Sequence, residues 1–213
     1  MKDELQEIID QAQSIIPLMV IDSLEQALPM AQALKDGGLT VFEVTLRTAC
    51  ALDAIKLLKK NMPECSIGAG TVINTDQFQQ VAWAGGDFIV SPGMNDDMIN
   101  MAQDMAIPFI PGVATPSDVM TAVNAGFEIL KFFPAEQYGG ATALKALAGP
   151  FREITFCPSG GININNAPDY LALPNVTCVS GSWIFPKDAV ARNDWGTITE
   201  LAREASKLNL SQQ

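Results

Sequence analysis

The chain has 213 residues, of which 48% are hydrophobic and 17% charged, and its formal net charge is −11. This acidic balance argues against a nucleic-acid surface, which needs a basic patch, and against an anionic membrane surface, but backbone amides could still bind a phosphate. The sequence contains no histidine, which excludes Ser-His and Cys-His nucleophile pairs and removes the commonest ligand of catalytic zinc.

Residues 1–13 are predicted to form a short N-terminal helix. Apolar, β-rich runs then recur roughly every 20–27 residues, and a helical pattern follows each of them. The runs start near Ser14, Leu39, Ser66, Asp87, Ile107, Phe127, Glu153 and Val176. A last helix is predicted over 195–208, and the tail at 209–213 is predicted to be frayed and solvated.

One of these helices has a clear start in the sequence. Thr115 is a suitable N-cap, Pro116 suits the first helical position, and Asp118 places an acid in the first turn. The alternation of strands and helices therefore predicts an α/β fold, namely a single domain over 1–213 that forms one (β/α)₈ TIM barrel. An open doubly wound sheet is the alternative, although no GxGxxG motif follows the first strand.

The four cysteines are Cys50, Cys65, Cys157 and Cys178, and none of them forms a CxxC pair. This scatter indicates neither a metal site nor redox chemistry. The sequence also has no secretory apolar segment and no apolar run of membrane length. Together these features predict a cytoplasmic protein with reduced thiols.

In a TIM barrel the reactive groups lie at the C-terminal ends of the strands. Lys131 stands near the end of one apolar run, where burial favours the neutral amine that can form a Schiff base with a ketone. The alternative is a lysine whose ammonium reaches water at a strand end.

Glu43, Thr45 and Arg47 share one strand parity, so Glu43 could serve as acid and base and Arg47 could bind a carboxylate. A structural Glu43–Arg47 ion pair is the alternative.

Two glycine-containing segments follow the last two predicted strands. They are Ser159-Gly160-Gly161-Ile162 and Gly181-Ser182-Trp183. TIM barrels frequently bind phosphate at this place, on loop amides and at the start of a short helix. Two ordinary tight turns are the alternative interpretation.

The strand-end motifs together resemble those of the bacterial 2-dehydro-3-deoxy-6-phosphogluconate (KDPG) and 4-hydroxy-2-oxoglutarate (KHG) aldolases, over essentially the whole chain. The matching runs are Phe42-Glu43-Val44-Thr45-Leu46-Arg47-Thr48, Gly68-Ala69-Gly70-Thr71-Val72, Ser91-Pro92-Gly93, Ile110-Pro111-Gly112, Lys131-Phe132-Phe133-Pro134-Ala135-Glu136, Phe156-Cys157-Pro158-Ser159-Gly160-Gly161-Ile162 and Gly181-Ser182-Trp183.

The resemblance implies a homotrimer of barrels with class I aldolase chemistry, no metal or other cofactor, and a place in the Entner–Doudoroff pathway. It implies that Lys131 forms the Schiff base and that Glu43 is the acid and base. Arg47 and Thr71 would bind the pyruvate carboxylate beside Pro92 and Phe133, and the phosphate would lie on Gly160, Gly161 and Ser182. Gly181 would also belong to the substrate site. The family usually has threonine at the position of Ser159, near the substrate C4 hydroxyl, and glycine is common at the position of Ser180.

The residues leave other functions open. The same chemistry could act mainly on KHG or on 2-dehydro-3-deoxy-6-phosphogalactonate. A phosphate-binding isomerase or epimerase would need no imine, and a sensor of phosphorylated sugar acids would need no buried amine. A metal-dependent aldolase is disfavoured by the absence of histidine.

Overall fold

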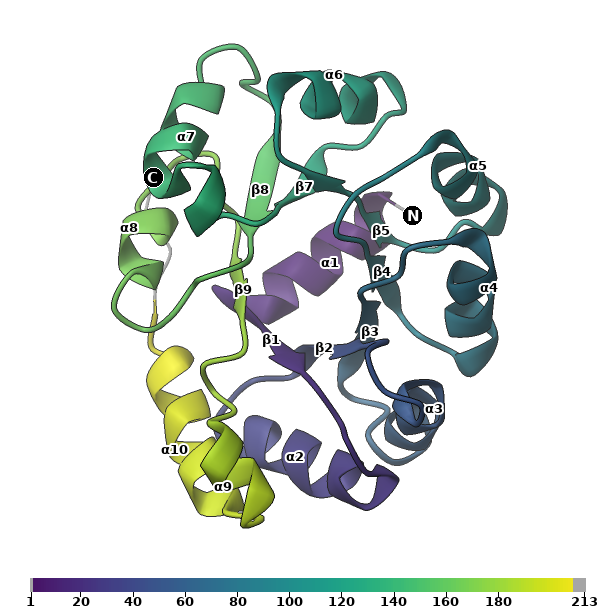
Figure 1. Cartoon of the computed structure of the whole chain (residues 1–213), viewed down its shortest axis with the longest axis vertical. Helices are drawn as coiled ribbons and strands as arrows, with labels where there is room; N and C mark the ends of the chain where they lie inside the picture. The colour runs from purple at the N-terminus through teal and green to yellow at the C-terminus, as the bar shows by residue number, and fades with distance from the viewer. Residues whose placement is uncertain (1, 209–213) are drawn as a thin grey trace.

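The computed structural model describes residues 2–208, which form parallel strands surrounded by helices (Figure 1). The strands are β1 (Ile15–Met19), β2 (Val41–Thr45), β3 (Ser66–Gly70), β4 (Phe88–Val90), β5 (Phe109–Ile110), β6 (Gly112–Val113), β7 (Ile129–Phe132), β8 (Thr155–Pro158) and β9 (Val179–Gly181). The predicted strand regions are therefore confirmed to within a few residues.

Helices follow the strands and lie outside them in Figure 1. They are α2 (Leu24–Asp36), α3 (Ala51–Asn61), α4 (Thr75–Ala84), α5 (Asp96–Met105), α6 (Pro116–Asn124), the short 3₁₀ helix η1 (Glu136–Tyr138), α7 (Gly140–Leu147), α8 (Ala167–Leu171), α9 (Lys187–Ala191) and α10 (Trp195–Ala205). The predicted helix start at Thr115 is confirmed, with a reciprocal capping box to Asp118. The predicted N-terminal helix is α1 (Lys2–Ala12), whereas the predicted frayed tail at 209–213 lies outside the described residues.

The prediction of a closed (β/α)₈ TIM barrel is wrong. Within the described residues, six strands form one parallel sheet in the order β5-β4-β3-β2-β1-β9, and β6-β7-β8 form a separate sheet. Register is regular inside each sheet; Glu43, for example, pairs with Gly68 on one side and with Leu18 on the other. The chain is therefore an α/β protein with two parallel sheets.

A proline stands at each boundary between the two sheets. Pro111 separates β5, which pairs with β4, from β6, which pairs with β7. At the other boundary, Phe156 donates its N–H to Asn175 on the β9 side, and the next N–H on that side would belong to Pro158. Proline has no N–H to donate. Only isolated bridges, Phe156↔Val176 and Ser159↔Ser180, therefore join β8 to the segment around β9.

Side chains of each strand alternate between two hydrophobic layers. On β2, Phe42 and Val44 belong to the larger layer beneath the outer helices, whereas Val41 belongs to an inner cluster. The inner cluster includes Leu5, Ile8 and Ile9 of α1, and Figure 1 shows α1 crossing the centre of the view between the strands. The polar residues on the inner face lie further along the strands, toward the C-terminal ends and away from α1.

Candidate active site

A cavity of about 370 Å³ opens at the C-terminal ends of the strands. Its lining comes from both sheets and from the loops that follow them. The lining residues are Leu18, Arg47, Thr71, Pro92, Lys131, Phe133, Ser159, Gly160, Gly161, Ile162, Gly181 and Ser182. Segments that are far apart in the sequence are therefore brought to one place, as expected when parallel strands end on the same side.

Lys131 reaches this cavity from the inner face of β7. Its neighbours Leu130 and Phe132 point to the outer layer, and Ile129 belongs to the inner cluster. The Lys131 side chain is only 6% exposed, so the alternative of an ammonium that reaches bulk water is wrong. Its Nζ lies 5.4 Å from the centroid of the Phe133 ring, a distance suited to a cation–π contact.

Glu43 lies beside Lys131 on the inner face of β2. Its Oε1 is 3.7 Å from Lys131 Nζ, the side chain is 2% exposed, and Oε1 accepts no hydrogen bond within the described part of the chain. Burial raises the pKa of Glu43 above its ordinary value, although the positive charges of Lys131 and Arg47 act against this rise. A buried carboxyl of this kind is suited to holding and releasing a proton.

The inner face of β3 makes room for the Glu43 carboxylate. Gly70 pairs with Thr45, and a Cβ at Gly70 would lie 1.6 Å from Glu43 Oε1. The glycine is therefore required by close packing. Thr45, which shares the parity of Glu43, does not line the cavity; its hydroxyl donates to the Met19 carbonyl and so connects β2 to β1.

Arg47 and Thr71 form one side of the cavity. Arg47 Nε donates a 3.0 Å hydrogen bond to Thr71 Oγ1. Glu43 pairs with Lys131 and not with Arg47 among the ion pairs of residues 2–208, so the proposed structural Glu43–Arg47 pair is not seen. Thr71 has φ of 61°, which is unusual for a β-branched residue and commonly marks a functional position.

The segment Ser159–Gly161, which we call the glycine loop, also lines the cavity. Gly160 and Gly161 have φ of 97° and 81°, a conformation that glycine adopts readily. Ser159 is 1% exposed, and its Oγ has no hydrogen-bond partner in the described structure. An unpaired buried hydroxyl beside a cavity is costly, and a bound polar ligand would provide its missing partner.

The sequence located most of this lining, but it missed two residues. Leu18 lies at the end of β1, with the same parity as the inner residue Ile16, and this parity was the signal that could have found it. Ile162 directly follows the glycine loop. The residues Lys131, Glu43, Arg47, Thr71, Pro92, Phe133, Ser159, Gly160, Gly161, Gly181 and Ser182 are brought together as a group, while their individual roles stay predictions.

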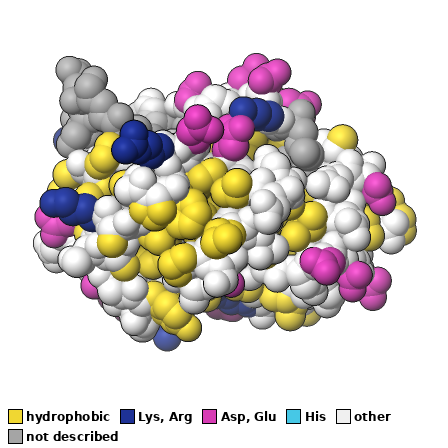
Figure 2. Space-filling view, turned by 90° about the horizontal axis from the view of Figure 1, so that it is seen from above, with side chains coloured by type: hydrophobic (Ala, Val, Ile, Leu, Met, Phe, Trp, Pro, Cys, Tyr) yellow, Lys and Arg dark blue, Asp and Glu magenta, His cyan; other side chains and the backbone are white. Residues whose placement is uncertain are grey.

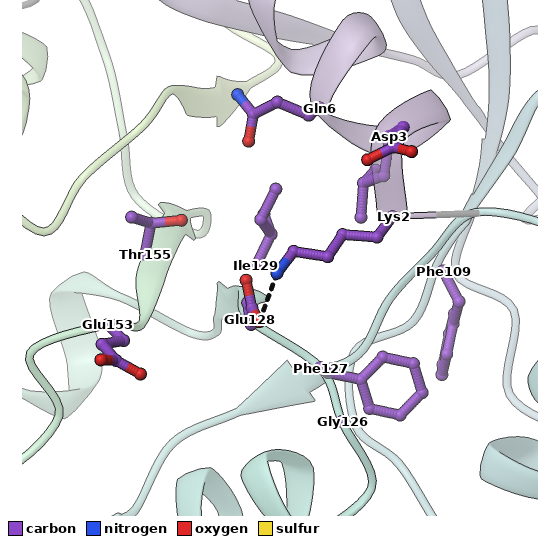
Figure 3. A pocket seen from close by; sticks show the side chains of 11 residues that line it. Lys2, Asp3, Gln6, Phe109, Gly126, Phe127, Glu128, Ile129, Glu153 and Thr155 are labelled. Carbon is purple, nitrogen blue, oxygen red and sulfur yellow. Dashed lines mark hydrogen bonds and ion pairs between the residues drawn. The ribbon is translucent and has the colours of Figure 1, made fainter.

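A second cavity, of about 320 Å³, lies at the other end of the molecule beside α1 (Figure 3). Glu128, Ile129 and Thr155, at the starts of β7 and β8, contribute to its wall. Its lysine, Lys2, is 73% exposed and forms an ion pair with Glu128 (Figure 3). Because an exposed, paired ammonium is a poor nucleophile, this cavity is not the candidate active site.

No group of three or more His, Cys, Asp or Glu residues suited to a metal occurs within residues 2–208. None of the helices in that range has the length and apolar character needed to cross a bilayer.

Comparison with known proteins points to one family. The family model for KDPG and KHG aldolases matches residues 5–201. The KHG/KDPG aldolase of Escherichia coli (strain K12) is 49% identical over 191 residues, which cover 90% of each chain.

Two solved structures are similar over nearly the full length. KDPG aldolase from Legionella pneumophila, with pyruvate captured at low pH as a covalent carbinolamine intermediate, has a TM-score of 0.93 and 46% identity, covering 96% of this chain and 99% of that one. The Zymomonas mobilis ZM4 enzyme with 3-phosphoglycerate has a TM-score of 0.92 and 43% identity, with 97% of each chain covered.

Proposed function

The chain belongs to the KDPG and KHG aldolase family, and we propose that it is a class I lyase that cleaves KDPG to pyruvate and glyceraldehyde 3-phosphate. The observation that carries this proposal is the buried ion pair between Glu43 and Lys131, the lysine that lines the cavity. An amine next to a carboxyl group supplies both parts of Schiff-base chemistry, namely the nucleophile and the proton carrier.

The first half of the reaction builds an electron sink. The neutral Lys131 amine attacks C2 of the keto acid, and the resulting carbinolamine loses water to give an iminium. Glu43 moves the protons that this step requires. Arg47, positioned by its bond to Thr71, binds the substrate carboxylate with its planar guanidinium, while Pro92 and Phe133 enclose that end.

The second half breaks the carbon–carbon bond. Glu43 takes the proton of the C4 hydroxyl, the C3–C4 electron pair moves to the iminium, and C4 leaves as the aldehyde of glyceraldehyde 3-phosphate. The protonated Glu43 then returns a proton to C3 of the enamine, and hydrolysis of the new iminium releases pyruvate and the free amine. A glutamate with a raised pKa suits both directions of this proton transfer.

The far end of the cavity is proposed to bind the phosphate. The glycine loop and the Gly181–Ser182 segment line the same cavity as Arg47 and offer backbone N–H groups and a hydroxyl. The buried Ser159 hydroxyl, unpaired within the described residues, is proposed to contact the substrate at the C4 hydroxyl.

Because the family also includes KHG aldolases, we infer that the enzyme cleaves KHG to pyruvate and glyoxylate as well. KHG carries no phosphate, so the pyruvate end of the site would carry most of its binding. Comparing kcat/KM for KDPG, KHG and 2-dehydro-3-deoxy-6-phosphogalactonate will identify the preferred substrate; a clear preference for the galactonate-derived acid would contradict the main proposal.

Two further proposals concern the setting of the enzyme. The four free thiols support a cytoplasmic location.

A homotrimer is supported by apolar side chains on the face that Figure 2 shows, which is the upper end of Figure 1 where α6 lies. On α6, Met120 and Val123 are 57% and 41% exposed, and exposed apolar groups favour association. Sedimentation should give the mass of three chains, and a monomer would refute this.

The decisive experiment is borohydride reduction in the presence of pyruvate, followed by peptide mass mapping. Reduction should fix pyruvate covalently to Lys131. A protein that stays unmodified would overturn the Schiff-base mechanism and favour an isomerase or epimerase. Modification at another lysine would overturn the assignment of Lys131 alone. Full activity after chelation would separately test the expectation that no metal is needed.

A further inference from the structure

A buried tyrosine behind the glycine loop has no part in the chemistry described above. Tyr170, on α8, is 1% exposed and its hydroxyl donates a hydrogen bond to Oε1 of Glu136, the first residue of η1. Burial is the main cause that raises the pKa of Tyr170, and the contact with Glu136 raises it further. The hydroxyl is therefore protonated and acts as a donor at neutral pH. This hydrogen bond connects two segments that lie on either side of the glycine loop.

Glu136 itself packs directly on the glycine loop. A Cβ at Gly161 would lie 2.5 Å from Glu136 Cγ, so the carbon chain of the glutamate occupies the space beside that glycine. The Glu136 N–H donates to the Gly160 carbonyl at 3.1 Å, and the preceding Ala135 N–H donates to the Ser159 carbonyl at 2.8 Å. Displacement of the Glu136 side chain would therefore move Gly160 and Gly161, whereas the bond from Ala135 continues to hold Ser159.

The segment leading into α8 holds the same loop from the other side. Asn166 Nδ2 donates to the Gly161 carbonyl at 3.0 Å, and Asn166 Oδ1 accepts from the Asn163 N–H at 2.7 Å. The Gly160 and Gly161 carbonyls are thus both bonded to protein donors behind the loop. No protein acceptor within residues 2–208 takes the Gly161 N–H, which leaves it available to an anion.

We propose that Tyr170 and Glu136 are positioning residues for the phosphate of the substrate, acting through the glycine loop. The hydrogen bond between Tyr170 and Glu136 holds η1 and α8 together across the glycine loop. It also fixes the Glu136 side chain, whose carbon chain packs on Gly161. The inference rests on the proposed function and adds a specific role: these two residues favour phosphorylated substrates over unphosphorylated ones.

The test compares Tyr170→Phe with the wild type on two substrates. Phenylalanine keeps the ring packing and removes only the hydroxyl, so KM for KDPG should rise about tenfold, because a hydrogen bond to a charged group is lost. KM for KHG, and the extent of pyruvate trapping by borohydride, should remain within about twofold of the wild type. Tyr138→Phe is the matched control, because Tyr138 is 52% exposed on η1 and should change neither KM.

A second pair of variants keeps the proposal testable if the buried Tyr170→Phe variant folds poorly. Glu136→Gln retains an acceptor for the tyrosine hydroxyl and should keep KM for KDPG near the wild-type value. Glu136→Ala removes the acceptor and should raise this KM as Tyr170→Phe does, again with KHG unaffected.

The possible failures can be told apart. If Tyr170→Phe and Glu136→Ala change KM for KDPG and KHG equally, or change neither, the positioning role is wrong while pyruvate trapping by the wild type still supports the aldolase. If the wild type itself neither traps pyruvate nor cleaves KDPG, the proposed function is wrong and this inference fails with it.

Discussion

Nζ of Lys131 and Oε1 of Glu43 lie 3.7 Å apart, and both side chains are almost completely buried, at 6% and 2% exposure. The two residues come from β7 and β2, which belong to different sheets. Burial raises the pKa of Glu43, and the positive charge of Lys131 acts against this rise. The Lys131 amine lines the cavity, and the Glu43 carboxyl group lies directly beside that amine, within reach for proton exchange through it.

Replacement of the amine tests the covalent step. Lys131→Met should lower kcat for KDPG cleavage by several orders of magnitude, because no other group in the cavity can form the imine. It should also abolish borohydride trapping of pyruvate. Lys56→Met is a suitable control, since Lys56 is 59% exposed and pairs only with Asp53 on α3. Near-normal turnover in Lys131→Met would refute the assignment.

Replacement of the carboxyl group tests the proton-transfer step. Glu43→Gln should lower kcat about 10²- to 10⁴-fold. The carboxylate form is needed to take the C4 hydroxyl proton, so activity should fall as the pH drops through the pKa of Glu43. Because burial raises that pKa, the fall should begin at a higher pH than for an ordinary glutamate. A pH profile of kcat/KM that lacks this acidic limb, or that keeps it in Glu43→Gln, would argue against Glu43.

The space next to Glu43 offers an independent check. Gly70→Ala would place a Cβ 1.6 Å from Glu43 Oε1. Since the contact is with the end of a flexible side chain, the fold can respond by moving the carboxylate. We expect a large loss of kcat with a near-native circular dichroism spectrum. Gly149→Ala serves as the control, because its nearest neighbour is the Ala146 carbonyl at 3.8 Å. Equal activity of the two variants would contradict the proposed role of the Glu43 position.

Thr71 should show a trade-off between stability and activity. A left-handed conformation costs a non-glycine residue roughly 1–2 kcal/mol, and glycine adds roughly 0.5–1 kcal/mol of unfolded-state entropy. Thr71→Gly should therefore change the free energy of unfolding by no more than about 1.5 kcal/mol. It should nevertheless raise KM for both substrates, because Arg47 loses its partner.

The comparison variant for Thr71 is Thr45→Gly, measured by urea unfolding. Thr45 is buried and donates to the Met19 carbonyl, so its loss should cost roughly 1–3 kcal/mol. Equal destabilisation of the two variants would show that Thr71 is not held in a costly conformation for function.

Local patterns were the most predictable part of the fold. Thr115, Pro116 and Asp118 predicted a helix start that the capping box confirms, because a cap depends on residues three positions apart. The strand regions were found for the same reason, since a strand shows as a short apolar run bounded by turns. The assembly of those strands was predicted wrongly: Pro111 and Pro158 each remove a donor at a sheet boundary, and a count of strands does not detect this.

The sequence by itself predicted which residues are candidates for the chemistry and at which strand ends they stand, because residue type and position along a parallel strand suffice to place Glu43, Arg47, Lys131 and the glycine loop at one end of the molecule. Only the tertiary structure decided that the strands form two sheets, that Leu18 lines the cavity, and that Tyr170 bonds to Glu136. These features are contacts between segments distant in the chain, and they depend on packing that no local pattern encodes.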